Sequence, residues 1–432
     1  MDTIEKVNGF FNSLGFKLGL IAFLSLLLLI PAAMIQDLIR EREQRRNETI
    51  IEVSSIWGNS QVINGPVLTV PYEITEKRAD GQLITRVNYA HFLPDNLNIE
   101  GRMIPELRKR GIYSVVTYSA QIRVTGTFKP ETASPVEGLN FDSPANAFVE
   151  IGIPDMRGIN KDIVVKWNDS EAGVIPGMKT TDVASSGVHA PVQFSRGNVY
   201  NFSFDLDLNG SSSLNFIPLG KVTNVNLTST WADPSFSGAF LPDERKIDEK
   251  GFTASWNVLQ LNRNFPQFWL NDDYEVTQSA FGVELITPVD HYQKSERSAK
   301  YAILFIGLTF LIFFFAEIMT KTRIHPVLYL LTGFAVVVFY SLLTALSEHI
   351  SFNIAYIVAA LTITSMVGLF ARSLYKNSRV TLVIISSMVI LYTFLFVILQ
   401  LADYSLLIGN IGLVIILAVV MYFARKIDWY SR

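Results

Sequence analysis

Six long apolar segments dominate the pattern of hydrophobic and polar positions along the 432-residue chain. One lies near the start, five lie in the last third, and a long polar segment separates the two groups. A helix needs roughly 20 apolar residues to cross a hydrocarbon core about 30 Å thick. Five consecutive helices that are apolar on every face could hardly be buried in a soluble domain of this size. The pattern therefore predicts transmembrane helices at residues 18–35, 301–319, 326–346, 352–370, 380–401 and 404–423.

Lysine and arginine are distributed unevenly between the predicted spans. They occur in the loops after the second and fourth spans and in the tail after the sixth, but not in the alternate loops. Because cationic loops stay in the cytoplasm, residues 1–17 and the tail 424–432 are predicted to be cytoplasmic. The long segment 36–299 is then predicted to lie on the side of the membrane opposite the cytoplasm. An arginine cluster at 40–46 opposes this orientation, but long segments translocate largely regardless of charge.

The first apolar segment also admits a second interpretation, a cleaved signal peptide, because Ala32 and Ala33 supply small residues near its end. Two observations favour an uncleaved anchor. The region before the segment is nearly neutral, and the apolar run continues to Ile35. We therefore expect the first span to remain in the protein as a membrane anchor.

The chain contains no cysteine, so the exported segment has no disulfide framework and must be stabilised by its own core. This composition fits a bacterial inner-membrane protein with a large domain in the periplasm. The net charge of −3 is too small to indicate a nucleic-acid partner. The predicted partners are the lipid bilayer and a periplasmic protein, a glycan or a lipid component of the envelope.

The polar segment changes its period from helical to two after its first part. Ile50, Val53 and Trp57 recur at helical spacing, so residues 36–58 are predicted to form a juxtamembrane helical stalk. Beyond it, apolar and polar residues alternate, as is typical of half-buried strands. We predict an all-β periplasmic domain at 59–299, with antiparallel sheets packed as a sandwich; one or two sandwiches are both compatible. Strands are predicted within residues 67–70, 87–93, 112–125, 148–153, 163–167, 200–208, 225–231 and 252–258.

The familiar catalytic signatures are absent from this sequence. It has no nucleophile-elbow serine, phosphate-binding loop, paired-histidine zinc motif, dinucleotide fingerprint or cysteine nucleophile. Its five histidines are scattered along the chain, and His91 and His189 lie far apart. No catalytic residue, metal site or cofactor is therefore predicted.

Two charged clusters in the β-rich segment are candidate binding sites. Asp155 and Arg157 follow a predicted strand and could present a carboxylate and a guanidinium to a ligand, although a turn with an internal ion pair explains them better. A basic cluster at 106–110 precedes the long strand that begins at residue 112. It could touch an anionic headgroup or glycan, but a solvated turn is the favoured interpretation.

A third candidate combines polar and aromatic residues. Asn262, Arg263 and Asn264 lie just before Phe268 and Trp269, and such a mixture is typical of interaction surfaces. Plain packing explains the same residues equally well. A loop or subdomain boundary is predicted at 129–146, where Pro, Ser and Gly are frequent.

Charged residues are rare in the predicted spans. Glu317 lies near the end of the second span, and Glu348 and His349 follow the third. A carboxylate in a bundle is a functional candidate because it is costly to leave unpaired in lipid, but one near an interface can reach headgroups or the neighbouring Lys321. Transport would require charged or helix-breaking residues near the midplane of several spans, and these spans have almost none.

Several longer motifs carry a resemblance to a known family. The sequence resembles the CreD family of bacterial inner-membrane proteins, also called the cell envelope integrity protein family, nearly from end to end. The motifs that carry the resemblance include Leu29-Ile30-Pro31, Trp57-Gly58, Gly65-Pro66-Val67-Leu68, Phe92-Leu93-Pro94-Asp95, Asn209-Gly210-Ser211, Phe240-Leu241-Pro242, Leu261-Asn262-Arg263-Asn264-Phe265-Pro266 and Ser347-Glu348-His349.

The resemblance implies an association with envelope integrity, colicin tolerance and the regulon of a carbon-source-responsive two-component system. It supplies no catalytic residue. The leading hypothesis is a non-enzymatic envelope protein, in which a helical bundle anchors a β-rich domain that binds an envelope component. The alternative is a transporter or channel component that uses the helical bundle. A periplasmic hydrolase is a third hypothesis, and it rests only on scattered carboxylates such as Asp95, Asp155 and Asp233.

Overall fold

The computed structural model describes residues 14–77, 82–130, 147–195, 197–286, 291–401 and 404–425. The chain forms two compact units. The helical unit comprises Met1–Arg46 and Val289–Arg432, and the β unit comprises Asn47–Pro288. The division falls within one long helix, α3.

The helical unit contains the predicted transmembrane segments. Among the described residues, six helices are long and apolar enough to span a membrane, with α2 and α3 counted as one. The prediction of one N-terminal and five C-terminal spans is therefore confirmed. The helices are α2 (Leu14–Leu27), α3 (Leu29–Trp57), α4 (His291–Lys300), α5 (Ala302–Thr320), α6 (Pro326–Ser347), α7 (Phe352–Tyr375), α8 (Ser378–Gln400) and α9 (Ser405–Ala424).

Local sequence signals set the helix ends in this unit. Lys321 and Lys376 terminate α5 and α7 in the left-handed conformation, with φ of 54° and 50°. Pro326 begins α6, where a missing N–H costs nothing. The Asn377 carboxamide accepts a hydrogen bond from the Arg379 N–H at 3.0 Å and so caps α8.

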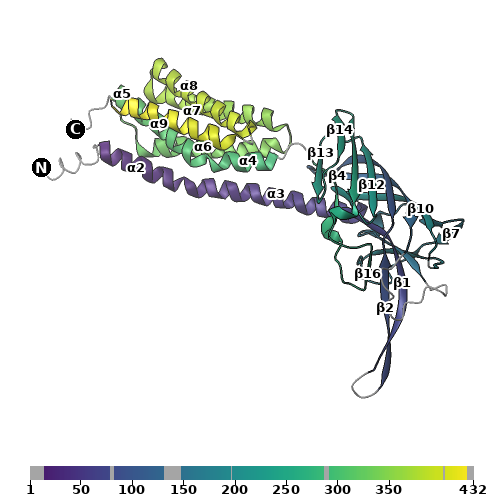
Figure 1. The fold of residues 1–432 in the computed structure, drawn as a ribbon. Helices are drawn as coiled ribbons and strands as arrows, with labels where there is room; N and C mark the ends of the chain where they lie inside the picture. The colour runs from purple at the N-terminus through teal and green to yellow at the C-terminus, as the bar shows by residue number, and fades with distance from the viewer. Residues whose placement is uncertain are drawn as a thin grey trace. The chain divides into compact units, whose positions relative to one another are not determined.

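Packing within the helical unit is sequential and rich in aromatic rings (Figure 1). α2 packs against α5 and α6, α6 against α7, α7 against α8, and α9 against α8. The Phe339 ring of α6 lies 4.6 Å from the Tyr392 ring of α8. The Tyr356 hydroxyl of α7 donates to the Tyr392 carbonyl at 2.7 Å. These buried rings join α6, α7 and α8 into one core.

The β unit is built from two sheets with a common core. The first has the strand order β13-β17-β11-β1-β5-β9-β8, and β2 and β16 extend it from β1. The second has the order β14-β15-β12-β3-β4-β10-β6-β7. One hydrophobic cluster contains side chains of both sheets, including Leu68 and Val149 from the first and Ile99, Val124 and Leu206 from the second. The strands are β1 (Gln61–Lys77), β2 (Leu83–Phe92), β3 (Asn96–Arg110), β4 (Tyr113–Phe128), β5 (Phe148–Gly152), β6 (Val164–Trp167), β7 (Ser170–Gly173), β8 (Ile175–Pro176), β9 (Gly187–Pro191), β10 (Tyr200–Ser211), β11 (Ser213–Phe216), β12 (Val222–Ser229), β13 (Pro234–Gly238), β14 (Glu244–Asp248), β15 (Gly251–Leu259), β16 (Phe268–Leu270) and β17 (Phe281–Leu285).

The β fold is confirmed, but the sheets are mixed rather than purely antiparallel. β1 pairs in parallel with β11, and β12 pairs in parallel with β3. All other strand pairs named among the described residues are antiparallel. The parallel pairs join strands far apart in sequence, so the period-two pattern could not reveal them.

Two boundaries differ from the sequence-based predictions. The predicted β domain at 59–299 is too long, because the last strand ends at Leu285 and residues 291–300 form α4. The basic cluster at 106–110 is not a turn, since it is the end of β3. The turn that follows is made by Gly111, with φ of 61°. Most of the loop predicted at 129–146 lies outside the described residues.

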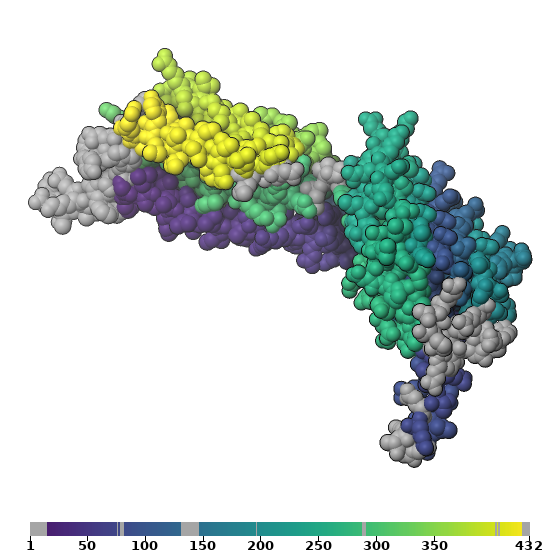
Figure 2. All heavy atoms as spheres, viewed as in Figure 1, coloured from purple at the N-terminus to yellow at the C-terminus, as the bar shows by residue number. Residues whose placement is uncertain are grey.

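A two-stranded hairpin projects from the rest of the β unit (Figures 1 and 2). β1 and β2 pair with each other from Leu68–Phe92 out to Lys77–Leu83. β5 pairs with β1 only up to Thr69, and β16 pairs with β2 only from Ala90 onward. The outer part of the hairpin therefore has two edges that pair with no strand among the described residues.

Candidate functional site

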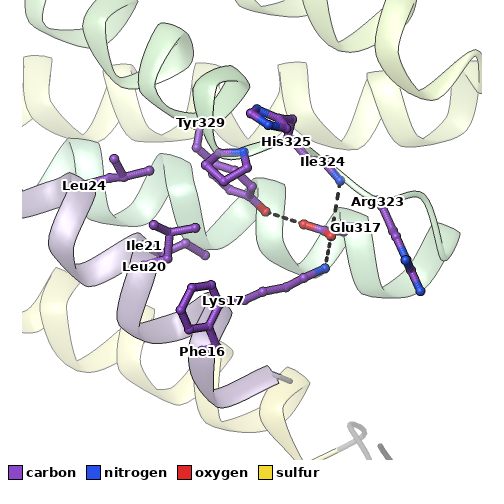
Figure 3. Close-up of a pocket in the computed structure, with 11 residues that line it drawn as sticks. Phe16, Lys17, Leu20, Ile21, Leu24, Glu317, Arg323, Ile324, His325 and Tyr329 are labelled. Atoms are coloured by element: carbon purple, nitrogen blue, oxygen red, sulfur yellow. Dashed lines mark hydrogen bonds and ion pairs between the residues drawn. The ribbon is translucent and has the colours of Figure 1, made fainter. Parts of the chain in front are cut away.

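A polar cluster surrounds Glu317 at the end of the helical unit where α5 ends and α6 begins (Figure 3). One carboxylate oxygen accepts hydrogen bonds from the Lys17 ammonium and from the Ile324 N–H at 3.3 Å. The other oxygen accepts from the Tyr329 hydroxyl at 2.8 Å. The Glu317 side chain is only 6% exposed. The carboxylate therefore has a donor for each oxygen, as a buried charge requires.

Three segments bring these groups together. Glu317 lies in the last turn of α5, Ile324 in the short connection to α6, and Tyr329 in the first turn of α6. Lys17 comes from the first turn of α2 and is 24% exposed. The neighbour predicted for Glu317 was Lys321, but its partner in the structure is Lys17, three hundred residues away in sequence.

The cluster borders a pocket of about 300 Å³. Apolar side chains of α2, Leu20, Ile21 and Leu24, form one wall, and Arg323 and His325 lie on the other side (Figure 3). This pocket has the mixed polar and apolar lining of a small-molecule or lipid-headgroup site. Its carboxylate is already bonded to donors within the chain, so it is better suited to holding α2 against α5 and α6 than to taking up a cation.

Glu348 forms a second cluster at the opposite end of α6. Its carboxylate accepts from the Tyr292 hydroxyl of α4 at 3.0 Å and lies 3.9 Å from the Arg42 guanidinium of α3. The Gln36 carboxamide of α3 also donates to the Ala299 carbonyl of α4 at 3.1 Å. The Glu348 side chain is 9% exposed, whereas His349 is exposed. The two predicted membrane carboxylates thus attach the N-terminal helices to the C-terminal bundle at both ends.

In the β unit, Asp155 and Arg157 form the internal ion pair expected of a structural turn. Arg157 donates to Asp155 from its side chain at 2.9 and 2.8 Å. Asp155 also accepts from the backbone and side chain of Asn59, both at 2.9 Å. These bonds, above all those from Arg157, lower the pKa of Asp155. The carboxylate is used to fix the chain before β1 and is not free for a ligand.

The segment 262–269 is divided between structural and exposed residues. Arg263 is 7% exposed and donates to the Phe265 and Leu219 carbonyls at 2.6 and 3.0 Å. Trp269 is 3% exposed. The predicted interaction surface is therefore wrong for these two side chains, because they are packed inside the fold. Asn262 and Asn264 are exposed, and the Asn262 carboxamide accepts from the Leu259 N–H at 3.0 Å.

A buried polar network that the sequence did not predict crosses the first sheet. The Thr69 hydroxyl lies 2.9 Å from the Glu150 carboxylate and 3.0 Å from Nδ1 of His91. Nε2 of His91 lies 3.1 Å from the Asp182 carboxylate. Glu150 also accepts from the N–H groups of residues 179 and 180, at 3.1 and 3.3 Å. Side chains of β1, β2 and β5 thus hold the loop between β8 and β9.

The network shifts the pKa of two of its members. Burial raises the pKa of Glu150 to about 7, although Thr69 and two backbone N–H groups oppose the shift. Burial lowers the pKa of His91, and Asp182 partly opposes that shift. Both shifts favour the neutral form, because ionisation in a buried site is costly.

The same geometry allows one proton to be shared between Glu150 and His91. In the first arrangement the Glu150 carboxyl is protonated and donates to the Thr69 hydroxyl. The Thr69 hydroxyl then donates to Nδ1 of His91, and the Nε2–H group of His91 donates to the Asp182 carboxylate. With Glu150 ionised, Thr69 donates to it, and His91 must carry two protons to donate to both neighbours. Thr69 and His91 are 0% exposed, so a substrate reaches neither the threonine hydroxyl nor the imidazole. The arrangement is suited to holding a loop, and its only sequence signal is an acidic residue inside an apolar strand.

The histidine, aspartate and glutamate side chains do not cluster into a metal site in the part of the chain that the structure describes. No set of three or more of them in the described ranges is placed to hold a metal ion. In the buried network, the imidazole of His91 is bonded to Thr69 and Asp182 rather than directed with the carboxylates toward a common point.

Comparison with known proteins gives one consistent family. The family model described as "Inner membrane protein CreD" matches residues 13–430. The inner membrane protein CreD of Escherichia coli strain K12 is 33% identical over 413 residues, which cover 94% of this chain and 91% of that relative.

Two solved structures show remote similarity. A mutant M1 zinc metallopeptidase from Deinococcus radiodurans, bound to a Tyr-Ser-Ala substrate, shares 8% identity with a TM-score of 0.21, over 38% of this chain and 39% of that one. A mutant two-domain M1 zinc metallopeptidase bound to L-arginine shares 9% identity with a TM-score of 0.20, over 44% of this chain and 42% of that one.

Proposed function

The chain belongs to the CreD family of inner membrane proteins, and on this premise we propose that it is a non-enzymatic protein that supports the cell envelope. In this proposal the six spans anchor the protein in the inner membrane. The β unit lies in the periplasm and binds a component of the envelope there. The lysine and arginine distribution between the spans supports this orientation.

The β1–β2 hairpin is the observation that carries the binding role. Its outer part has two edges unpaired within the described residues, and an unpaired edge is a template for an added strand. Leu83 and Val87 lie two positions either side of Thr85 and so share one face of the hairpin, where they are 70% and 54% exposed. A two-stranded hairpin is only marginally stable alone. A protein strand in the periplasm is therefore the partner that fits it best.

The internal use of charged groups supports a role other than catalysis. Asp155 is bonded to Arg157 and Asn59, and Glu150 is bonded to Thr69 and two backbone N–H groups. Arg263 donates to backbone carbonyls. These groups stabilise the β unit, which leaves its exposed strands as the surface for recognition.

The role of the β unit can be tested in cells that lack the endogenous protein, by uptake of a bulky dye that an intact envelope excludes. The full chain should restore the barrier. A chain in which residues 59–286 are replaced by a flexible linker should not restore it, provided that it is present in the membrane fraction. Full restoration by this shortened chain would contradict the proposal.

The hairpin can be tested separately by substitutions in the full chain. Leu83→Asp combined with Val87→Asp places two charges on its exposed face and should abolish restoration. Ile247→Asp is the matched control, because Ile247 is 47% exposed on β14, outside the hairpin. If the double variant restores the barrier as well as the control does, the hairpin is not the binding surface.

Transport through the helical unit is a second candidate function, and the pocket beside Glu317 is the observation that favours it. Flux of a solute in vesicles containing the full chain, lost on Glu317→Gln but kept on Glu348→Gln, would support this function. Unchanged flux in both variants would count against it.

A further inference from the structure

A second cavity in the helical unit, of about 570 Å³, lies between α5, α8 and α9. Its walls are almost entirely aliphatic and aromatic. They are formed by Leu308, Leu311, Ile312, Phe315, Ala316 and Met319 of α5, by Val380, Val383, Ile384, Ser387, Ile390 and Leu391 of α8, and by Ile415, Ile416, Val419, Val420 and Phe423 of α9. This composition matches the interior of a bilayer, so the cavity suits a hydrocarbon chain.

The cavity spans the depth of one membrane leaflet. Its lining on α8 runs from Arg379 to Leu391, and a rise of 1.5 Å per residue makes this about 18 Å. Half of a hydrocarbon core about 30 Å thick is about 15 Å. The cavity therefore has the length of a lipid tail that enters from one side of the membrane.

One end of the cavity carries a cation. Arg379 lies at the start of α8 and is exposed, and it lines the cavity. Among the described residues, its guanidinium has neither a hydrogen bond nor an ion pair. None of the residues that line the cavity is acidic. A guanidinium at the membrane surface binds phosphate through paired hydrogen bonds, so it complements an anionic lipid headgroup.

The third wall of the cavity is the most loosely packed helix of the unit. Only 6% of the apolar window of α9 is buried, against 39% for α8 and 50% for α5. Figure 2 shows α9, in yellow, along the outer surface of the helical unit. The contact between the Phe315 and Phe423 rings, at 5.8 Å, joins α9 to α5 beside the cavity. A hydrocarbon chain in the gap would supply the packing that α9 lacks.

We propose that this cavity binds one anionic phospholipid, with an acyl chain between α5, α8 and α9 and its phosphate at Arg379. The lipid fills the space between the helices and holds α9 on the bundle. This site is separate from the pocket beside Glu317, and it does not depend on the role of the β unit.

The test uses the full chain in vesicles of phosphatidylethanolamine and phosphatidylglycerol. Two probes carry the same photoreactive acyl chain, one on phosphatidylglycerol and one on zwitterionic phosphatidylcholine. After irradiation, labelled peptides are identified by mass spectrometry. The phosphatidylglycerol probe should label α5, α8 and α9 about fivefold more strongly, which corresponds to roughly 1 kcal/mol for one arginine at an anionic lipid surface.

Two pairs of variants separate headgroup from tail. Arg379→Gln should abolish the preference for phosphatidylglycerol, whereas Arg323→Gln should keep it, because Arg323 lines the other pocket. Ile416→Phe fills the cavity and should reduce labelling by both probes several-fold. Leu417→Phe should not, because Leu417 is 59% exposed and does not line the cavity.

Four results would overturn the proposal. The first three are a headgroup preference that survives Arg379→Gln, equal labelling of the Ile416→Phe and Leu417→Phe variants, and an equal preference for the phosphatidylglycerol probe on spans outside α5, α8 and α9. Crosslinking of α9 to a second copy of the chain, with the probes excluded, would assign the cavity to a protein partner and would also overturn it. Far-ultraviolet circular dichroism and size-exclusion profiles identify any variant that fails to fold, and Val420→Phe then replaces Ile416→Phe.

Discussion

Replacing Glu150 by glutamine should remove a pH dependence from the stability of the β unit. In the native structure burial raises the pKa of Glu150 from 4.5 to about 7. The folded state then binds the proton more tightly than the unfolded state does. Stability from this group is therefore complete below pH 4.5 and is lost as pH rises to about 7. The contribution of His91 to stability changes with pH in the opposite direction. Because the pKa of His91 is lowered, this contribution rises with pH below 6.5. The two effects partly cancel in the wild-type protein.

The size of the effect follows from the shift. A change from 4.5 to about 7 is about 2.5 units, and each unit corresponds to 1.36 kcal/mol, so the effect is about 3 kcal/mol. Glutamine resembles the protonated carboxyl, since its oxygen can accept from the N–H groups of residues 179 and 180 and its amide can donate to Thr69. The variant should therefore be only slightly more stable than the wild type at pH 5, just above the unfolded-state pKa of 4.5. At pH 8 the variant should be more stable by about 3 kcal/mol.

The assay is denaturant unfolding of the full chain in detergent, followed by tryptophan fluorescence at several pH values. Five of the six tryptophans lie in the β unit, and the Trp269 ring is 5.5 Å from the His91 ring. Glu171→Gln is the matched control, because Glu171 is exposed on β7. A stability difference between Glu150→Gln and wild type that stays constant from pH 5 to pH 8 would refute the reasoning.

Three further predictions concern other contacts. Lys17→Met leaves the Glu317 carboxylate without its cation and should lower the thermal stability of the helical unit, measured by circular dichroism. The double variant with Glu317→Gln should recover part of the loss, with a coupling energy of about 1–3 kcal/mol. Additive effects of the two substitutions would contradict the role of this ion pair in holding α2 against α5. Arg263→Met leaves buried carbonyls unbonded and should cost about 3 kcal/mol in denaturant unfolding; an unchanged midpoint would show that these bonds contribute nothing. Gly126→Ala places a Cβ 2.1 Å from a backbone oxygen and should cost roughly 2–3 kcal/mol, whereas Gly173→Ala meets nothing within 4 Å; equal effects would contradict the packing of β3 against β4.

The membrane helices were predictable because each is a local property of the sequence. A run of about 20 apolar residues identifies a span without knowledge of its neighbours. The strands with alternating residues were predictable for the same reason. β3 shows where prediction from alternation fails. Leu97, Ile99 and Met103 alternate as a strand requires, but Gly101 interrupts the apolar series and the last third of the strand is exposed. Its charged end therefore resembled a turn.

The polar clusters could be predicted only in part. Glu317 was recognisable as a carboxylate at the end of an apolar span, but its partner Lys17 comes from the other end of the chain. The network of Glu150, His91 and Asp182 joins two strands and a loop that are separated by many residues. Such contacts depend on the order of strands in the sheet, and one sequence does not contain that order in any local pattern. The burial of Arg263 could not be predicted for the same reason, because it donates to the carbonyl of the distant Leu219.

The orientation of the β unit is the central claim of the proposed function, and thiol labelling in cells measures it directly. The chain has no cysteine, so single substitutions report without background. Ser170→Cys places a thiol on exposed β7, and Ser373→Cys places one at the exposed end of α7. With the outer membrane permeabilised and the inner membrane intact, a membrane-impermeant maleimide should label residue 170 and spare residue 373. Labelling of residue 373 with protection of residue 170 would contradict the account.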